Sequence, residues 1–249
     1  MFEHIKIRCS SLGYLMVEPR GKKERDAGEL SETAKTHLTD IYVSERYGRN
    51  TDITTKYTEK GLMVEEDSIT LYCRLKRKFL KKNEQMVQNP YIKGTPDLYE
   101  GIDILAADKI TDIKSSWDLY TFSRIRTKPI NDQYWWQLQG YMWLTGARSA
   151  TLAYCLVNTP ETLISDEKRK LLWKMGVISE EDSTYQQACE ELDKAMRFDD
   201  IAMEERVIPF QIERDDVAIA MIAAKVIKGR EFLEQLHGVI TGKTILQCL

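Results

Sequence analysis

The chain has 249 residues, of which 43% are hydrophobic and 30% charged, and its formal net charge is −3. This length can bury a full hydrophobic core, and the composition is ordinary for a globular protein. Five scattered cysteines without a CxxC pair argue for a reducing compartment and against a disulfide framework or a structural zinc. Only three histidines are present, which disfavours a catalytic triad or an HExxH site.

The longest uncharged apolar run, at 217–224, is much shorter than the roughly 20 residues of a membrane helix. The N-terminus has no apolar stretch typical of a secretory signal. We therefore expect a cytoplasmic protein of a bacterial or phage-infected cell, without membrane contact.

The predicted elements follow from hydrophobic periodicity, helix caps and the placement of glycine and proline. Ser31 is a candidate N-cap, Pro129 suits the first turn of a helix and Gly146 suits its end. We predict helices at 10–16, 31–47, 58–82, 130–145, 165–176, 180–204 and 213–237. We predict strands at 91–99, 102–106, 110–116, 149–158 and 206–212.

This order of elements predicts an α/β fold of mixed character, with a central mixed sheet flanked by helices. We expect a single domain over 1–249 that has three parts. These are an N-terminal helical region at 1–57, a core at 58–158 and a C-terminal helical and strand elaboration at 159–249.

The segment TDIK places Asp112 and Lys114 two residues apart in a predicted strand. Successive side chains on a strand point to opposite faces, so Asp112 and Lys114 share one face and Ile113 lies on the other. An exposed ion pair on an edge strand would explain the pattern as well as a reaction site would, and the choice depends on the rest of the chain.

Three further segments carry candidate residues. Asp97 follows a glycine and a proline in KGTPD, and Gln137 and Tyr141 lie four apart on one helix face. In the helix predicted at 58–82, the apolar stripe consists of Leu62, Ile69, Tyr72 and Phe79. Glu65 falls inside this stripe, where an unpaired carboxylate is costly to bury. A buried ion pair is the structural alternative for this glutamate.

Gathered within about 4 Å, the carboxylates of Glu65, Asp97 and Asp112 would repel one another by roughly 4 kcal/mol per pair at an effective dielectric constant near 20. Such a cluster is understandable if it holds a divalent cation such as Mg²⁺, which prefers oxygen ligands and bridges to phosphate. Lys114 would then orient water or stabilise the transition state of phosphoryl transfer.

Two basic runs stand out in a chain that is acidic overall, RLKRKFLKK at 74–82 and SRIRTKP at 123–129. Each alone is typical of a solvated surface, but two runs flanking the candidate site favour a polyanionic substrate. We expect sequence-independent contacts to DNA phosphates from these runs. The residues are Arg74, Lys76, Arg77, Lys78, Arg124, Arg126 and Lys128.

The ordered set of Glu65, GTPD ending at Asp97, DIK at 112–114 and QLQGY at 137–141 resembles the PD-(D/E)xK nuclease superfamily. The spacing in KGLMVE, which also selects Glu65 over Glu66, is similar to the λ-exonuclease-like, YqaJ-type viral recombinases. So is the opening segment IRCSSLGYLM, in which Ser10 is a candidate phosphate contact. The resemblance covers roughly residues 5–158 and implies a restriction-endonuclease-like core.

The resemblance implies a Mg²⁺-dependent exonuclease that digests one strand of linear duplex DNA from its 5′ end in phage recombination. Mn²⁺ would substitute for Mg²⁺, and one or two ions would bind. The implied ligands are Glu65, Asp97, Asp112 and the backbone carbonyl of Ile113. Lys114 would be the catalytic lysine, and Gln137 and Tyr141 would line the site and contact substrate. A ring-shaped trimer and a single-strand annealing protein are the implied partners.

The sequence departs from the family in two respects. Asp112 stands where many relatives carry glutamate. The family's arginine that recognises a terminal 5′-phosphate has no evident counterpart before Ser10, where the candidates are Glu3, His4 and Lys6.

Three other interpretations stay open. A RecB-like repair or CRISPR-associated nuclease would fit if it lacks the iron–sulfur cluster that such proteins often hold on four cysteines. A non-catalytic DNA-binding module on the same fold is the second. An α/β scaffold with chance motifs is the third, and it leaves Glu65 and the Gln137/Tyr141 pair unexplained.

Overall fold

In the computed structural model, which describes residues 1–49 and 55–242, a five-stranded sheet forms the centre of the molecule. Its strand order is β2-β5-β6-β7-β8, with β6 and β7 parallel and the other neighbours antiparallel. The strands are β2 (Lys81–Lys82), β5 (Leu98–Gly101), β6 (Ala107–Ser115), β7 (Ser149–Cys155) and β8 (Val207–Glu213). Parallel neighbours need a long crossover, and the chain between β6 and β7 supplies it with two helices.

A second, three-stranded sheet lies at the N-terminal side, with the order β1-β4-β3. Its strands are β1 (Ile7–Arg8), β3 (Val87–Gln88) and β4 (Ile92–Gly94). Ile7 pairs with Ile92 and Arg8 with Lys93 in the parallel β1–β4 ladder. This pairing brings the first residues of the chain beside the segment that leads to Asp97.

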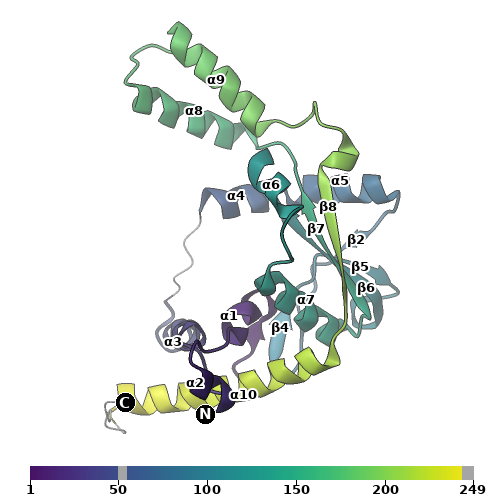
Figure 1. Cartoon of the computed structure of the whole chain (residues 1–249), viewed down its shortest axis with the longest axis vertical. Coiled ribbons are helices and arrows are strands. Elements are labelled where there is room, and N and C mark those ends of the chain that lie inside the picture. The colour runs from purple at the N-terminus through teal and green to yellow at the C-terminus, as the bar shows by residue number, and fades with distance from the viewer. Residues whose placement is uncertain (50–54, 243–249) are drawn as a thin grey trace.

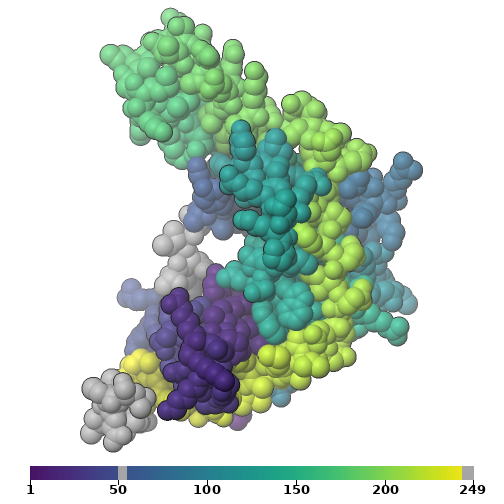
Figure 2. Space-filling view, viewed as in Figure 1, coloured from purple at the N-terminus to yellow at the C-terminus, as the bar shows by residue number. Residues whose placement is uncertain are grey.

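Helices surround the two sheets (Figure 1). One hydrophobic cluster joins α1 (Leu12–Met16), α3 (Glu32–Tyr47), α7 (Asp132–Thr145) and α10 (Asp216–Ile240) to the N-terminal side of the sheet. The remaining helices are α2 (Lys22–Asp26), α4 (Lys56–Met63), α5 (Glu65–Lys76), α6 (Leu119–Ile125), α8 (Glu161–Met175) and α9 (Ser183–Met196). The α8–α9 hairpin projects from the body, and Figure 2 shows the molecule hollowed between its N-terminal part and the α4 and α6 side.

The mixed α/β class is confirmed, and several elements lie where the sequence predicts them. Ser31 caps α3, since its hydroxyl accepts a hydrogen bond from the Ala34 N–H at 3.2 Å. Gly146 ends α7 in the left-handed conformation. Helix α7 begins later than predicted, because Asn131 caps it by accepting from the Gln133 N–H, and Pro129 lies before the helix and not in its first turn. The predicted strand at 102–106 is wrong, because Ile104–Ala106 form a 3₁₀ turn.

The single helix predicted at 58–82 is wrong. It is two helices separated at Val64, and α5 ends at Arg77, which adopts a left-handed φ of 52°. The predicted apolar stripe is therefore only half buried. Ile69 and Tyr72 lie in the core, whereas Leu62 is 73% and Phe79 98% exposed.

No described helix is long and apolar enough to span a bilayer. The cysteines that the structure describes, Cys9, Cys73, Cys155 and Cys189, are all free thiols, and Cys248 lies outside the described residues.

Gly94 permits the close approach of β4, the turn at Cys9 and helix α7. A Cβ atom at this position would lie 2.6 Å from Tyr141 Cε1 and 3.1 Å from the Cys9 Cβ and Sγ atoms. We predict that Gly94→Ala lowers the free energy of unfolding by about 1–3 kcal/mol, the usual cost of overpacking. Urea unfolding followed by circular dichroism measures this change.

Gly61→Ala is the matched control, because a Cβ there meets no atom within 4 Å. It should leave stability unchanged or raise it by up to about 1 kcal/mol through helix propensity. Equal effects of the two substitutions would contradict the packing role of Gly94.

Candidate functional site

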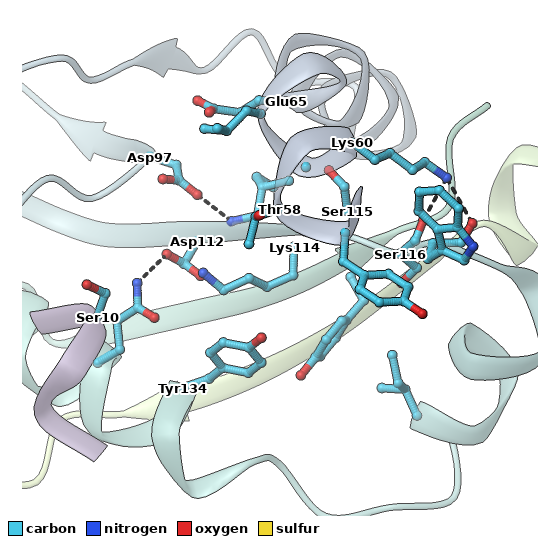
Figure 3. Close-up of a pocket in the computed structure, with 18 of the residues that line it drawn as sticks. Ser10, Thr58, Lys60, Glu65, Asp97, Asp112, Lys114, Ser115, Ser116 and Tyr134 are labelled. Atoms are coloured by element: carbon cyan, nitrogen blue, oxygen red, sulfur yellow. Dashed lines mark hydrogen bonds and ion pairs between the residues drawn. The ribbon is translucent and has the colours of Figure 1, made fainter. Parts of the chain in front are cut away.

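A cleft of about 900 Å³ lies between the α4–α5 segment on one side and β6 and α7 on the other. The six residues predicted as catalytic all line it, together with Ser10 (Figure 3). They are Glu65, Asp97, Asp112, Lys114, Gln137 and Tyr141. The structure therefore brings together residues that are up to 76 positions apart in the chain, from Glu65 to Tyr141.

Strand β6 carries the centre of the site. Asp112 Oδ2 and Lys114 Nζ are 2.8 Å apart, which confirms that the two side chains share one face. Ile113 points to the opposite side, where it is buried in a separate hydrophobic cluster. The pair is no surface salt bridge, because the Asp112 side chain is 3% and the Lys114 side chain 25% exposed. The alternative of an exposed ion pair on an edge strand is excluded, because β6 lies in the middle of the sheet.

Asp97 reaches the same point from the neighbouring strand. Asp97 directly precedes β5, and the first residue of that strand, Leu98, pairs with Thr111 of β6. Asp97 Oδ2 accepts a hydrogen bond of 2.7 Å from the backbone N–H of Ile113. The backbone at Asp97 is fixed from its other side by Asn83, which donates its N–H to Asp97 O at 2.8 Å and its side-chain amide to Pro96 O at 2.9 Å.

Helix α7 supplies the other contacts of Asp112. Gln137 Nε2 donates to Asp112 Oδ1 and also lies 3.0 Å from the Tyr141 hydroxyl oxygen, which accepts from it. Gln137 is 4% and Tyr141 5% exposed, so the hydrogen bonds are shielded from water. The predicted i, i+4 pair thus acts as a unit that orients the Asp112 carboxylate.

Glu65 faces the cleft from the first turn of α5, where the helix dipole favours a carboxylate. Its Oε1 atom lies 2.9 Å from Lys82 Nζ, and the same ammonium contacts Glu66 Oε1 at 2.5 Å. Glu66 is 71% exposed in its side chain and does not line the cleft. Lys82 is thus a site neighbour that sequence reasoning missed, since the predicted helix would have carried it away from Glu65.

The electrostatics of the site are dominated by two aspartates held close together. Burial and the nearby Asp112 carboxylate raise the pKa of Asp97 from 3.8 to about 7, against the opposing effect of Lys114. Burial alone would lower the pKa of Lys114, but Asp112 and Asp97 outweigh it and raise that pKa above its usual value. Burial, followed by the Asp112 charge, raises the pKa of Tyr141. Lys114 is accordingly a cation at neutral pH.

The oxygen donors of Asp97 and Asp112 fit a hard divalent cation. Mg²⁺ is commonly held by one or two carboxylates and keeps several waters. Its positive charge would counter both the burial and the Asp112 repulsion that raise the pKa of Asp97. Among residues 1–49 and 55–242, no three His, Cys, Asp or Glu side chains form a ready metal-holding group. Glu65, the third carboxylate predicted to join the two aspartates, has its carboxylate engaged by Lys82.

The rim of the cleft contains a residue that sequence reasoning missed, Lys60, and a tyrosine, Tyr134, whose spacing from Gln137 and Tyr141 places it on the same helix face. Lys60, only 1% exposed, donates to the backbone carbonyls of Ser116 and Trp117 at 3.0 Å each and so fixes the chain just after β6. Burial lowers the pKa of Lys60 to about 8. Tyr134 lies on the site face of α7, with Lys114 Nζ 4.9 Å from its ring centroid.

The prediction that no arginine before Ser10 is a candidate contact for a terminal phosphate is wrong, because Arg8 is such a residue. It lines the cleft together with Ser10, two residues further along the chain. In β1, Ile7 points inward and Arg8 outward. The alternation of side chains along a strand could therefore have identified Arg8 as an exposed residue from the opening segment alone.

The basic runs lie outside the cleft. Arg74, Arg77 and Lys78 surround a separate hollow at the far end of α5, and neither they nor Lys76 line the candidate site. Arg124, Arg126 and Lys128 lie at and after the end of α6, whose Thr121 and Ile125 do line the cleft. Arg126 donates to the Glu205 carbonyl at 2.8 Å. DNA binding by these residues stays a prediction.

Comparison with solved structures identifies similar proteins. A phage-related exonuclease from Haemophilus somnus 129PT matches with a TM-score of 0.72 and 28% identity over 97% of each chain. An alkaline exonuclease (LHK-Exo) from Laribacter hongkongensis matches with a TM-score of 0.63 and 14% identity, over 96% of this chain and 92% of that one. The same exonuclease in complex with dAMP matches with a TM-score of 0.62 and 15% identity, over 97% of this chain and 94% of that one.

No protein-family model matches the sequence, and no curated protein matches it. The structural likeness nevertheless extends over nearly the whole chain, and the site residues occur in the order that the sequence motifs indicate. The chain thus resembles the λ-exonuclease-like nucleases of the PD-(D/E)xK superfamily in fold.

Proposed function

We propose that this protein is a metal-dependent exonuclease that hydrolyses one strand of linear double-stranded DNA, starting at a 5′ end. The observation that carries the proposal is the group formed by Asp97, Asp112 and Lys114 in one cleft, with the Ile113 N–H bound to Asp97. The likeness to a phage-related exonuclease at 28% identity supports nuclease chemistry for this group.

Asp97 and Asp112 would hold the cation, with the Ile113 carbonyl and Glu65 as further oxygen donors. A bound Mg²⁺ supplies charge stabilisation at the phosphoryl group and lowers the pKa of water, and Mn²⁺ has similar ligand preferences. Gln137 and Tyr141 keep Asp112 in one orientation, which is the role of outer partners in metal sites.

Lys114 acts in this scheme as a cation and not as a base. Its raised pKa keeps it protonated at neutral pH, and its ammonium lies next to the aspartates that would position the phosphate. A fixed positive charge beside the reacting phosphoryl group stabilises the negative charge that grows in the transition state.

The end of the DNA strand would lie toward Arg8 and Ser10. Arginine binds phosphate through a rigid planar fork, and the Ser10 hydroxyl adds a hydrogen-bonding group on the same wall of the cleft. A contact to a terminal phosphate would explain action on ends and not within a circle. A trimeric ring and an annealing partner remain predictions from the family resemblance.

The direct test is digestion of linear duplex DNA labelled at one 5′ end, with and without Mg²⁺, beside the same DNA closed into a circle. We expect Mg²⁺-dependent release of label from the linear form only. Cleavage of circles would indicate an endonuclease instead. Binding without cleavage under Mg²⁺ or Mn²⁺ would leave a non-catalytic DNA-binding module.

Lys114→Ala should lower the rate of label release at least about a hundredfold, the usual effect of losing one group that stabilises transition-state charge. Lys109→Ala is the matched control, because Lys109 lies on the same strand but contacts Gln211 outside the cleft. The two rates are compared at saturating Mg²⁺. A rate for Lys114→Ala close to that of the control would remove Lys114 from the chemistry.

Glu65 and Glu66 form a second matched pair, since both contact Lys82 but only Glu65 lines the cleft. We expect Glu65→Gln to weaken Mn²⁺ binding by about 10–100-fold, the scale seen when groups that support a metal site are lost. Glu66→Gln should change it little. Titration calorimetry on the DNA-free protein measures both, and equal effects would mean that the cation is held without Glu65.

The pKa of Asp97 predicts how stability depends on pH without metal. A carboxyl group whose folded pKa is raised from 3.8 to about 7 stabilises the fold below its unfolded pKa, and this contribution is lost as the pH rises toward 7. Each pH unit in this window costs at most about 1.4 kcal/mol for one proton. In the metal-free protein, Asp97→Asn should therefore flatten the dependence of the free energy of unfolding on pH between pH 3.8 and about 7.

Denaturant unfolding at several pH values across that range measures the slope of the free energy of unfolding against pH. Asp108→Asn, an exposed position at the start of β6, is the control and should leave the slope unchanged. An identical profile in wild type and Asp97→Asn would show that Asp97 is ionised in the metal-free protein.

A further inference from the structure

We infer that a second hollow, next to the catalytic cleft, binds the single-stranded extension of a DNA end. This inference rests on the proposed nuclease function and names a further substrate class for it. The hollow, here called the α1–α3 hollow, has a volume of about 630 Å³. Arg8, Ser10, Tyr14, His37 and Lys93 are among the residues that line it.

The α1–α3 hollow lies next to the cleft. Arg8 and Ser10 line both cavities, so these two residues form their common boundary. Ser10 is seen at the edge of the catalytic group in Figure 3, beside Asp112. In our inference, a strand held at the aspartates extends across Arg8 and Ser10 into the α1–α3 hollow.

Two cations border this path. Arg8 and Lys93 are direct partners in the parallel β1–β4 ladder, so their side chains lie on the same face of the small sheet. Within the part of the chain that the structure describes, neither side chain has an acidic partner within ion-pair distance. Adjacent cations without a carboxylate partner are suited to the phosphates of a nucleic-acid backbone.

An aromatic surface on which a nucleic-acid base could stack lies where α1 and α3 line the hollow. Tyr14 of α1 is 41% exposed, and its ring centroid lies 5.5 Å from that of His37 on α3. His37 Nε2 is buried and has no hydrogen-bond partner among the described residues, although it borders an open cavity. A buried polar atom of this kind is normally satisfied by water or by a ligand. Aromatic faces stack with bases of any sequence.

Acidic residues restrict what the hollow can take. Asp40 and Glu45 also line it, but Glu45 is held by His4 at 3.1 Å, and Lys6 is held by Gln88 at 3.0 Å. The positive charge that lines the hollow thus lies mainly at Arg8 and Lys93. The volume suits a ligand of the size of one or two nucleotides. A short single strand fits these limits, whereas a duplex does not.

The consequence concerns which DNA ends are substrates. Because the proposed digestion starts at a 5′ end, a 5′ extension would enter the α1–α3 hollow while the duplex junction reaches the aspartates. Hydrolysis of one phosphodiester by one water would then release the extension as a short oligonucleotide. Ends with 5′ extensions would need no prior trimming.

The test measures binding by Lys114→Ala protein of fluorescent duplexes that have a blunt end, a short 5′ extension or a short 3′ extension. We expect the 5′ extension to bind about fivefold to tenfold more tightly than the blunt end, the scale of one stacked base. Tyr14→Ala or Lys93→Gln, added to this background, should remove most of that gain. Lys174→Gln is the charge-matched control, on the projecting hairpin, and should preserve it.

Tyr14 is partly exposed, and circular dichroism checks that the variant folds; Lys93→Gln tests the same inference if it does not. Equal affinity for blunt and extended ends would overturn the inference. So would a gain that both variants retain, or a gain seen only with the 3′ extension.

Product lengths from the wild-type protein with Mg²⁺ separate this inference from the proposed function. Release of the intact extension as an oligonucleotide supports both. If extended ends yield only mononucleotides, and the 5′ extension binds no more tightly than the blunt end, the inference about the α1–α3 hollow is overturned and the nuclease function stands. A gain in binding that depends on Tyr14 and Lys93, without any cleavage, overturns the nuclease function and keeps the hollow as a DNA site.

Discussion

The candidate site depends on the antiparallel pairing of β5 with β6, in which Leu98 lies opposite Thr111. This register places Asp97 beside the strand that carries Asp112, and the Ile113 N–H completes the contact with a hydrogen bond of 2.7 Å. A shift of one residue would send either aspartate to the opposite face of the sheet. Asn83 secures the register at the edge, since it binds the backbone of both Asp97 and Pro96.

This pairing has an electrostatic cost that the surrounding residues offset. Burial, followed by the nearby Asp112 carboxylate, disfavours the ionised form of Asp97 and raises its pKa. Lys114 neutralises Asp112 and Lys82 neutralises Glu65, so each acidic wall of the cleft has its own ammonium group. A cation binding between the walls would compete with both lysines. The site is therefore built around charge compensation, and the Gln137–Tyr141 pair adds orientation without adding charge.

The success and failure of the sequence predictions have a common physical explanation. Asp112 and Lys114 could be placed because strand alternation is a local rule, and Gln137 and Tyr141 because an α-helix repeats over four residues. The helix predicted at 58–82 was wrong because its apolar spacing continues through Val64 and past Arg77, where backbone geometry interrupts it. Lys82 was missed for the same reason. Arg8 and Lys93 could not be paired from sequence, because a parallel ladder between residues 85 positions apart leaves no local signal.

The sequence by itself determined the mixed α/β class, the acidic and lysine residues of the site and their order along the chain, because these follow from local periodicity and motif spacing. Only the tertiary structure decided that Lys82 contacts Glu65, that most of the basic run at 74–82 lies away from the cleft, and that Arg8 and Ser10 border two neighbouring cavities. These features depend on where helices end and which strands pair. Contacts between distant segments set both, and no short stretch of sequence contains them.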